Sequence, residues 1–310
     1  MKFQWKQYSC ALLAALIWGT AFVAQDLCAD LVGPFTFNAL RATIGALALG
    51  LFLLARGAIR KKVGFIPPKR DKKALLLGGA ISGFFLFAAS NLQQSGIGDS
   101  GGGKAAFITT LYIVLVPIVG IFFKQHIGVT VWCAVPIAAA GLYFLSIKED
   151  FTIATGDLFL IACAVMFTFQ IIAVDRFVTK TDGIELSCIQ FITMALLSWV
   201  GAIFEQPTLD AILACALPIL YVGVFSCGIA YTLQILSQKD TNPTVVSLIF
   251  SLEAVFGLAA TTLILQTVPS SREWIGCALL LGAVVLAQLP APKGKKKKTH
   301  KNCKPVDRIG

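Results

Sequence analysis

The sequence predicts an all-α membrane protein with ten transmembrane helices, arranged as two inverted repeats of five helices. Three observations lead to this fold class. Hydrophobic residues make up 57% of the chain and charged residues only 14%. Apolar runs of about 20 residues, long enough to cross a bilayer, recur from end to end, and the two halves resemble each other. Soluble domains are about one quarter charged, so this chain lacks the charge needed to cover a water-facing surface.

The apolar runs define ten predicted spans, separated by short loops that carry turn residues such as Gly33-Pro34, Pro67-Pro68 and Asn242-Pro243. A glycine-rich stretch, 96–103, is expected to be a flexible connection between the third and fourth spans. The first half holds 8–25, 35–55, 74–94, 104–123 and 128–147, and the second half holds 156–175, 184–204, 212–236, 243–266 and 272–289. The predicted units are therefore a first repeat, 1–150, a second repeat, 151–290, and a polybasic tail, 291–310.

Lysine and arginine are distributed unevenly between alternate loops. If the N-terminus is placed inside, 22 of them fall on the inner side, three fall outside and Arg41 lies within a span. Positively charged loops stay on the cytoplasmic side of a membrane. The sequence thus predicts a multi-pass protein of the cell membrane with both termini in the cytoplasm, and its compact loops are typical of a bacterial inner membrane protein. The tail is expected to anchor this topology on the anionic inner leaflet, with a role in partner binding left open.

An internal repeat relates the two halves. Ala15-Leu16-Ile17-Trp18 corresponds to Ala164-Val165-Met166-Phe167, and the stretch 110–114 corresponds to 251–255 at a similar spacing. Each half has an odd number of spans, so the second half runs upside down relative to the first. Inverted repeats are typical of secondary transporters, which bind their substrate near the midplane between the repeats. The repeat therefore indicates a carrier.

Polar side chains deep in a span are candidates for function because their burial in hydrocarbon is costly. Glu253 lies ten residues after Pro243, which places it about 15 Å deep. A carboxyl there suits a proton carrier or a counter-charge for a cationic substrate, although it could equally be a hydrogen-bonded group that fixes helix contacts. Its repeat mate Tyr112 and the deeply placed Trp18 are expected to contribute to the same site, with ordinary helix packing as the alternative for both.

Arg41 is a second charged candidate, about 10 Å inside the second span. It could bind a substrate carboxylate, it could extend its charged end towards the outer interface (snorkelling), or it could form a structural pair with an acid such as Asp26 or Asp30. Three further candidates, Gln25, Gln94 and Tyr231, lie near the ends of spans together with Asn91, Gln93 and Gln234. There they either line an entrance to the site or face water.

These residues fall in a pattern that resembles a known family. Trp18-Gly19-x-x-Phe22, Arg41, the stretch 106–117 and Leu252-Glu253-Ala254-Val255-Phe256 are similar to the EamA family of the drug/metabolite transporter superfamily, over roughly residues 8–289. The resemblance implies a ten-helix fold with a central cavity lined mainly by helices 1, 3, 4, 6, 8 and 9. It also implies transport of amino acids, other metabolites or drugs without ATP.

The remaining patterns argue against other classes of function. The nine cysteines include no C-x-x-C pair, and His126 and His300 lie far apart, so no metal site or other cofactor is expected. The net charge of +10 follows membrane topology and does not indicate nucleic acid binding. No nucleophile–base pattern predicts an enzyme. We therefore expect a secondary transporter that moves a small amino-acid-like or drug-like metabolite across the lipid bilayer by alternating access. A channel or lipid scramblase is the alternative function. The sequence leaves open whether the protein forms a homodimer.

Overall fold

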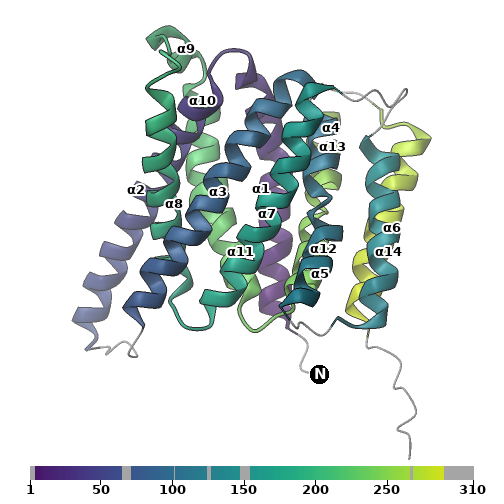
Figure 1. The fold of residues 1–310 in the computed structure, drawn as a ribbon, viewed down its shortest axis with the longest axis horizontal. Coiled ribbons are helices and arrows are strands. Elements are labelled where there is room, and N and C mark those ends of the chain that lie inside the picture. Colours follow the sequence, from purple (N-terminus) through teal and green to yellow (C-terminus); the bar gives the residue numbers. More distant parts are fainter. Residues whose placement is uncertain are drawn as a thin grey trace, which may run out of the picture.

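A computed structural model describes residues 4–64, 71–100, 102–123, 127–146, 154–265 and 268–289. Every regular element within these ranges is a helix (Figure 1). The first half contains α1 (Trp5–Ala29), α2 (Pro34–Lys62), α3 (Lys72–Ser100), α4 (Gly102–Thr110), α5 (Tyr112–Phe122) and α6 (Val129–Ser146). The second half contains α7 (Thr155–Val178), α8 (Gly183–Ala202), α9 (Leu209–Ala214), α10 (Ala216–Tyr221), η1 (Val222–Ala230), α11 (Tyr231–Gln238), α12 (Pro243–Phe250), α13 (Glu253–Leu265) and α14 (Ser271–Gln288).

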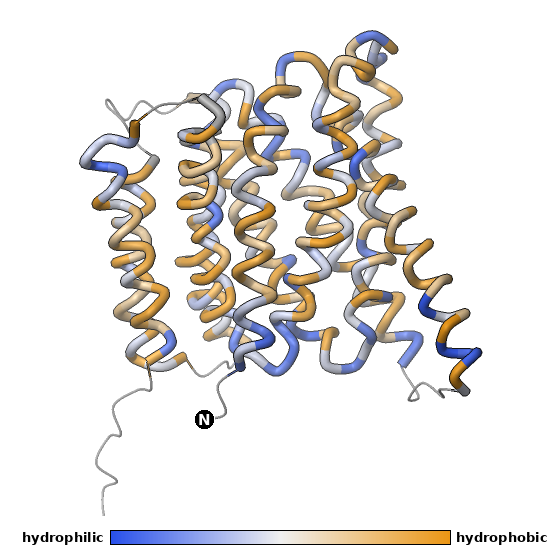
Figure 2. Tube along the Cα trace, turned by 180° about the vertical axis from the view of Figure 1, so that it is seen from behind, coloured by the Kyte–Doolittle hydropathy of each residue, from blue (hydrophilic) through white to orange (hydrophobic). Residues whose placement is uncertain are grey.

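Ten helical segments match the ten predicted spans. Within the described ranges, nine segments are long and apolar enough to cross a membrane, and α6 supplies a tenth, shorter apolar helix over Val129–Leu145. Hydrophobic residues dominate the middle of the bundle, and hydrophilic residues gather towards the helix ends (Figure 2). The predicted fold class is therefore confirmed. The boundary near residue 150, the tail 291–310, Pro67-Pro68 and both histidines lie outside the described residues.

The two halves interlock through their first helices. α1 packs against η1, α11 and α13 of the second half, while its repeat mate α7 packs against α3, α4 and α5 of the first half. The remaining helices pair across the repeat boundary as well, with α2 along α8 and α6 along α14. These reciprocal contacts are those of two inverted five-helix repeats, and they place α1 and α7 at the centre of the bundle.

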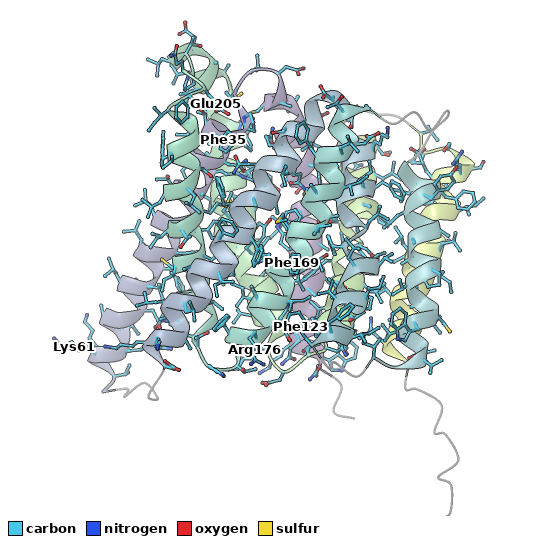
Figure 3. All side chains as sticks on the ribbon, in the orientation of Figure 1. Phe35, Lys61, Phe123, Phe169, Arg176 and Glu205 are labelled. Carbon is cyan, nitrogen blue, oxygen red and sulfur yellow. The ribbon has the colours of Figure 1, made fainter. Side chains whose placement is uncertain are left out.

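The two ends of the bundle are named here by the ends of α1. The Trp5 end holds Lys61 and Arg176, and the opposite Asp30 end holds Phe35 and Glu205 (Figures 1 and 3). At the Asp30 end, the Glu205 carboxylate accepts hydrogen bonds from the backbone N–H groups of Phe35 and Thr36, at 2.8 and 2.7 Å. It thereby satisfies donors that the start of α2 leaves unpaired.

At the Trp5 end, α2 and α8 are joined by ion pairs. Arg56 on α2 pairs with Asp182, 3.1 Å away, and with Glu185, 3.2 Å away. Asp182 also caps α8 by accepting from the backbone N–H groups of Ile184 and Glu185. Together with Glu205, these contacts fasten α2 and α8 to each other at both ends.

Glycines set the closest helix contacts. A Cβ added to Gly19 on α1 would lie 2.6 Å from the Glu253 carbonyl oxygen and 2.7 Å from the Gly257 nitrogen on α13. Gly96 and Gly156 likewise bring the backbones of α3 and α7 together. The expectation of a flexible connection is therefore wrong for residues 96–100, because α3 continues to Ser100 and the backbone of Gly96 packs closely against α7. α4 begins at Gly102, and Gly101 lies outside the described residues.

Three of the crossings contain a change of helical geometry. The fourth is interrupted at Leu111, where the backbone has φ −58° and ψ −10°. The ninth is interrupted at Ser251 and Leu252, and Ser251 has φ −59° and ψ −16°. These two breaks occupy equivalent places in the two repeats, immediately before Tyr112 and Glu253. The eighth crossing passes through the π-helical turns of η1, a geometry often found at functional sites.

Candidate functional site

A central cavity lies where the two repeats meet. It leaves about 40 Å³ for the centres of water-sized molecules, which is room for only a few waters or a small polar group. Its walls come from the first, third, fourth, sixth, eighth and ninth crossings, as the resemblance implies. In the labels of Figure 1 these are α1, α3, α4 with α5, α7, η1 with α11, and α12 with α13. Arg41 on α2, the second crossing, also lines the cavity. The lining residues are Trp18, Phe22, Gln25, Arg41, Gln93, Thr109, Tyr112, Phe167, Gln170, Ile171, Ser226, Tyr231, Gln234, Phe250 and Glu253.

Glu253 is the acidic group of the cavity. It is 5% exposed, and its Oε1 accepts hydrogen bonds from Thr110 Oγ1 at 3.1 Å and Tyr112 OH at 3.2 Å. Both donors flank the helix break of the first repeat, whereas Glu253 follows the equivalent break of the second. The two breaks thus meet through one carboxyl oxygen, while its Oε2 atom makes no hydrogen bond to any described residue.

Arg41 is the basic group of the cavity and is only 2% exposed. Its Nε donates to Asn38 Oδ1 at 2.7 Å and its Nη1 to Gln25 Oε1 at 3.2 Å, and the guanidinium carbon lies 5.5 Å from the centre of the Phe37 ring. The considered pairing with Asp26 or Asp30 is therefore wrong. Neutral amides on α1 and α2 orient the guanidinium, which leaves its positive charge uncompensated by these acids.

Aromatic rings form much of the remaining wall. Trp18 lies edge-on to Tyr231, with ring centres 4.9 Å apart, and edge-on to Phe250, 5.2 Å apart. On the other side, Tyr112 and Phe167 contact each other edge to face at 6.5 Å. The buried Nε1 of Trp18 has no hydrogen-bond partner among the described residues. It is therefore a donor that a polar group in the cavity can use.

Three glutamines from three helices form a chain that reaches this cavity. Gln234 Nε2 donates to Gln170 Oε1 at 2.9 Å, and Gln170 Nε2 donates to Gln190 Oε1 at 3.0 Å. Gln234 and Gln170 line the cavity, whereas Gln190 lies behind them on α8. Within the described part of the chain, the buried Oε1 of Gln234 has no donor, so the cavity also offers an unused acceptor.

Six of the seven residues predicted for the site line this one cavity: Trp18, Gln25, Arg41, Tyr112, Tyr231 and Glu253. Gln25 and Tyr231, expected near the entrances, lie in the same cavity as Glu253. Gln94 does not line it. It is 3% exposed, and its Nε2 donates to the backbone oxygen of Gln25 at 3.1 Å, while the preceding residue, Gln93, reaches the cavity.

Several lining residues were not predicted from the sequence, including Phe167, Gln170, Thr109 and Ser226. Phe167 was recoverable, because it is the repeat mate of Trp18. Gln170 lies one helical turn beyond Phe167, and so faces the same side of α7. Ser226 belongs to η1, where the π-helical turns shift the face that a regular helix would present.

Comparisons with known proteins agree with this architecture. The EamA-like transporter family matches residues 5–147 and 154–289, one match in each half. An "Uncharacterized transporter" of Archaeoglobus fulgidus is 27% identical, over 89% of this chain and 84% of its own length. The "Uncharacterized transporter YdfC" of Bacillus subtilis is 22% identical over 90% of each chain.

Solved structures also resemble this fold. One crystal structure of a protein superposes with a TM-score of 0.75 at 20% identity, covering 92% of this chain and 97% of that one. This likeness concerns the fold alone. With nearly the whole chain matched by one family, and with apolar helices long enough to cross a membrane, the protein is a membrane transporter that belongs to the EamA-like transporter family.

Proposed function

We propose that this protein is a secondary transporter that carries a small zwitterion with an apolar body, such as an amino-acid-like metabolite, by alternating access. One observation carries the proposal: Arg41 and Glu253, one group of each charge, line a single buried cavity between the inverted repeats. Polar groups placed in a mostly apolar pocket are what fixes the orientation of a bound small molecule.

The chemistry of the cavity suits both ends of a zwitterion. Arg41 has guanidinium N–H groups beyond those given to Asn38 and Gln25, and a planar guanidinium binds carboxylates well. Glu253 has an oxygen that accepts no hydrogen bond from described residues, and a cationic amine suits that position. The rings of Trp18, Tyr112 and other aromatic residues supply an apolar wall, and they also attract cations through their faces.

Alternating access is supported by the size and the symmetry of the site. A cavity with room for a few waters must expand before it admits a larger solute. Glu253 and Tyr112 follow equivalent breaks in the two repeats, so either repeat can move against the other around them. The excess of lysine and arginine in the predicted inner segments supports an orientation with the Trp5 end in the cytoplasm, in the cell membrane.

Counterflow in proteoliposomes tests this function. The probe is radiolabelled L-leucine, chosen as a small apolar zwitterion, with its N-acetyl and methyl ester derivatives as competitors that each lack one charge. We expect saturable exchange with preloaded unlabelled leucine and weak competition by either derivative. Equal competition by both derivatives would remove the zwitterion proposal. Flux that neither saturates nor exchanges would instead indicate a channel.

Variants of cavity residues, with a matched control, test whether the transported solute binds in the cavity. Arg41→Met and Glu253→Gln remove one charge each, and we expect each to reduce saturable exchange by about tenfold or more, because charge-assisted hydrogen bonds are the stronger ones. Arg56→Met is the control, since Arg56 pairs with Asp182 and Glu185 away from the cavity. Equal exchange by Arg41→Met and Arg56→Met would show that the solute does not use Arg41.

A further inference from the structure

A buried amide contacts the guanidinium of Arg41 from outside the cavity. Asn38 lies three residues before Arg41 on α2, so the two side chains share one face of the helix. It is fully buried, does not line the cavity, and its Oδ1 accepts the hydrogen bond from Arg41 Nε at 2.7 Å. Asn38 therefore orients the basic group of the cavity without occupying space that a solute needs.

The orientation of this amide is fixed by its other partners. Its Nδ2 donates to the backbone oxygen of Pro34 at 2.8 Å, to the backbone oxygen of Ser90 at 3.1 Å and to Asn91 Oδ1 at 3.1 Å. A backbone oxygen can only accept a hydrogen bond, and a guanidinium can only donate. Reversing the amide would place its oxygen beside two carbonyl oxygens and its N–H groups beside the guanidinium. The oxygen of Asn38 must therefore face Arg41.

The same alternation of donor and acceptor continues into α3. Asn91 Nδ2 donates to the backbone oxygen of Phe87 at 2.8 Å and to Ser198 Oγ on α8 at 3.4 Å. This leaves Asn91 Oδ1 to accept from Asn38. Position 38 thus needs a group that accepts from Arg41 on one side and donates to α3 on the other. A neutral amide meets both requirements, whereas a carboxylate can only accept.

This arrangement orients Arg41 without neutralising it. Asn38 and Gln25, its hydrogen-bond partners in the described part of the chain, are both neutral. None of the ion pairs found among the described residues includes Arg41. An aspartate at position 38 would instead form a buried ion pair, because the neighbouring guanidinium favours the ionised carboxylate. The amide therefore keeps one positive charge available to the cavity.

We infer that Asn38 is a positioning residue that sets the charge selectivity of the cavity, by holding Arg41 in the cavity wall while leaving its charge to the solute. The inference rests on the proposed function, in which Arg41 binds the carboxylate of a zwitterion. A charge-assisted hydrogen bond to that carboxylate is strong only while the guanidinium lacks an internal counter-ion. A carboxylate at position 38 would supply that counter-ion, and the cavity, which also holds Glu253, would then favour cations.

Ligand-induced thermal stabilisation of the full chain in detergent micelles tests this role, because a ligand that binds the folded state raises the unfolding temperature. The ligands are L-leucine, isoamylamine, which is leucine without its carboxylate, and isocaproate, which is leucine without its amine. For the wild type at neutral pH, we expect leucine to bind more tightly than either derivative. For Asn38→Asp, we expect leucine affinity to fall about tenfold or more and isoamylamine affinity to rise, so that the amine becomes the preferred ligand.

Two further variants separate charge from structure. Asn38→Leu removes the acceptor for Arg41 without adding a charge, so we expect weaker binding of leucine and isocaproate and unchanged binding of isoamylamine. Gln238→Glu is the matched control. Gln238 is 1% exposed, does not line the cavity, and donates to the backbone oxygen of Ile171 at 2.8 Å, so this variant also creates a buried carboxylate beside a carbonyl. We expect it to lower the unfolding temperature without ligand and to keep the wild-type preference for leucine.

Selectivity is the decisive readout, because a purely structural role of Asn38 would weaken the binding of all three ligands together. The inference is overturned if Asn38→Asp still prefers leucine to isoamylamine, or if Gln238→Glu shows the same reversal. If Asn38→Asp does not unfold cooperatively, Asn38→Leu decides, and equal weakening of all three ligands, or of none, overturns the inference.

Failure of the proposed function gives a different result. Wild-type protein that binds leucine no more tightly than its two derivatives would refute the zwitterion, and the inference would fall with it. A wild-type preference for leucine that survives Asn38→Asp would refute the role of Asn38 and leave the proposed substrate class standing.

Discussion

Gly19→Ala is the sharpest test of how the helices at the centre of the bundle pack. The added methyl group would lie 2.6 Å from the Glu253 carbonyl oxygen, 2.7 Å from the Gly257 nitrogen and 2.7 Å from Phe256 Cβ. None of these atoms lies at the end of a flexible side chain. α1 and α13 must therefore separate by about 1 Å to reach ordinary contact distances. Overpacking of this kind costs about 1–3 kcal/mol.

Gly257→Ala is the matched control from the other side of the same crossing. Its added methyl group would meet Gly19 atoms at 3.4 Å or more, which is ordinary van der Waals contact. Both variants gain the same helix propensity, about 1 kcal/mol, so the difference between them isolates the overpacking. Equilibrium unfolding by SDS in mixed micelles measures that difference. If Gly19→Ala unfolds at the same SDS concentration as Gly257→Ala, the close contact at Gly19 does not exist as described.

Three further predictions concern the cavity and the helix ends. Arg41→Lys keeps the charge but loses the planar fork, and we expect leucine competition to weaken about tenfold; unchanged competition would mean that the charge alone matters. Tyr112→Phe keeps the ring and removes one donor to Glu253, so we expect transport affinity to fall about two- to tenfold with little change in thermal stability. Glu205→Gln weakens the cap of α2, and we expect SDS unfolding to show a loss of about 1 kcal/mol in unfolding free energy. We expect a smaller loss for Arg56→Met, which removes an ion pair near the surface; a larger loss for Arg56→Met than for Glu205→Gln would contradict this reasoning.

The crossings and their inverted relation were predictable from the sequence because they depend on features that hydropathy records directly. A helix that crosses lipid needs a long apolar run, and an odd number of spans per repeat fixes the inversion. The depth of Glu253, Tyr112 and Trp18 followed from residue counts along their helices. Similar depth in the membrane, on equivalent helices for Tyr112 and Glu253, is what brought these three side chains to one cavity.

Rotation about a helix axis could not be predicted in the same way. Gln93 lines the cavity and Gln94 does not, although they are adjacent, since successive residues differ by about 100° around the axis. A helix that is apolar on most sides gives no pattern from which to choose the inward face. The partners of Arg41 were not predicted because amide oxygens, and not only carboxylates, can accept hydrogen bonds from a guanidinium.

The helix breaks had no local signature either. Neither Leu111 nor the pair Ser251-Leu252 includes the proline or glycine that usually marks an interruption. Pro117 and Pro136, which do predict irregularity, lie inside α5 and α6. The breaks lie at the point where Thr110 and Tyr112 reach Glu253, and the hydroxyls of Thr110 and Ser251 donate there to carbonyls of the preceding turn.

The π-helical turns of η1 have a consequence for how this cavity could diversify. A π turn contains one residue more per hydrogen-bonded ring than an α turn, so loss of one residue within Val222–Ala230 lets the segment return towards α-helix. Because the extra residue is absorbed within the π turns, such a deletion would leave Tyr231 and Gln234 of α11 facing the cavity and change only the residues of η1 that face it, such as Ser226. A single change in chain length would then alter one part of the cavity wall while the rest of this crossing keeps its orientation.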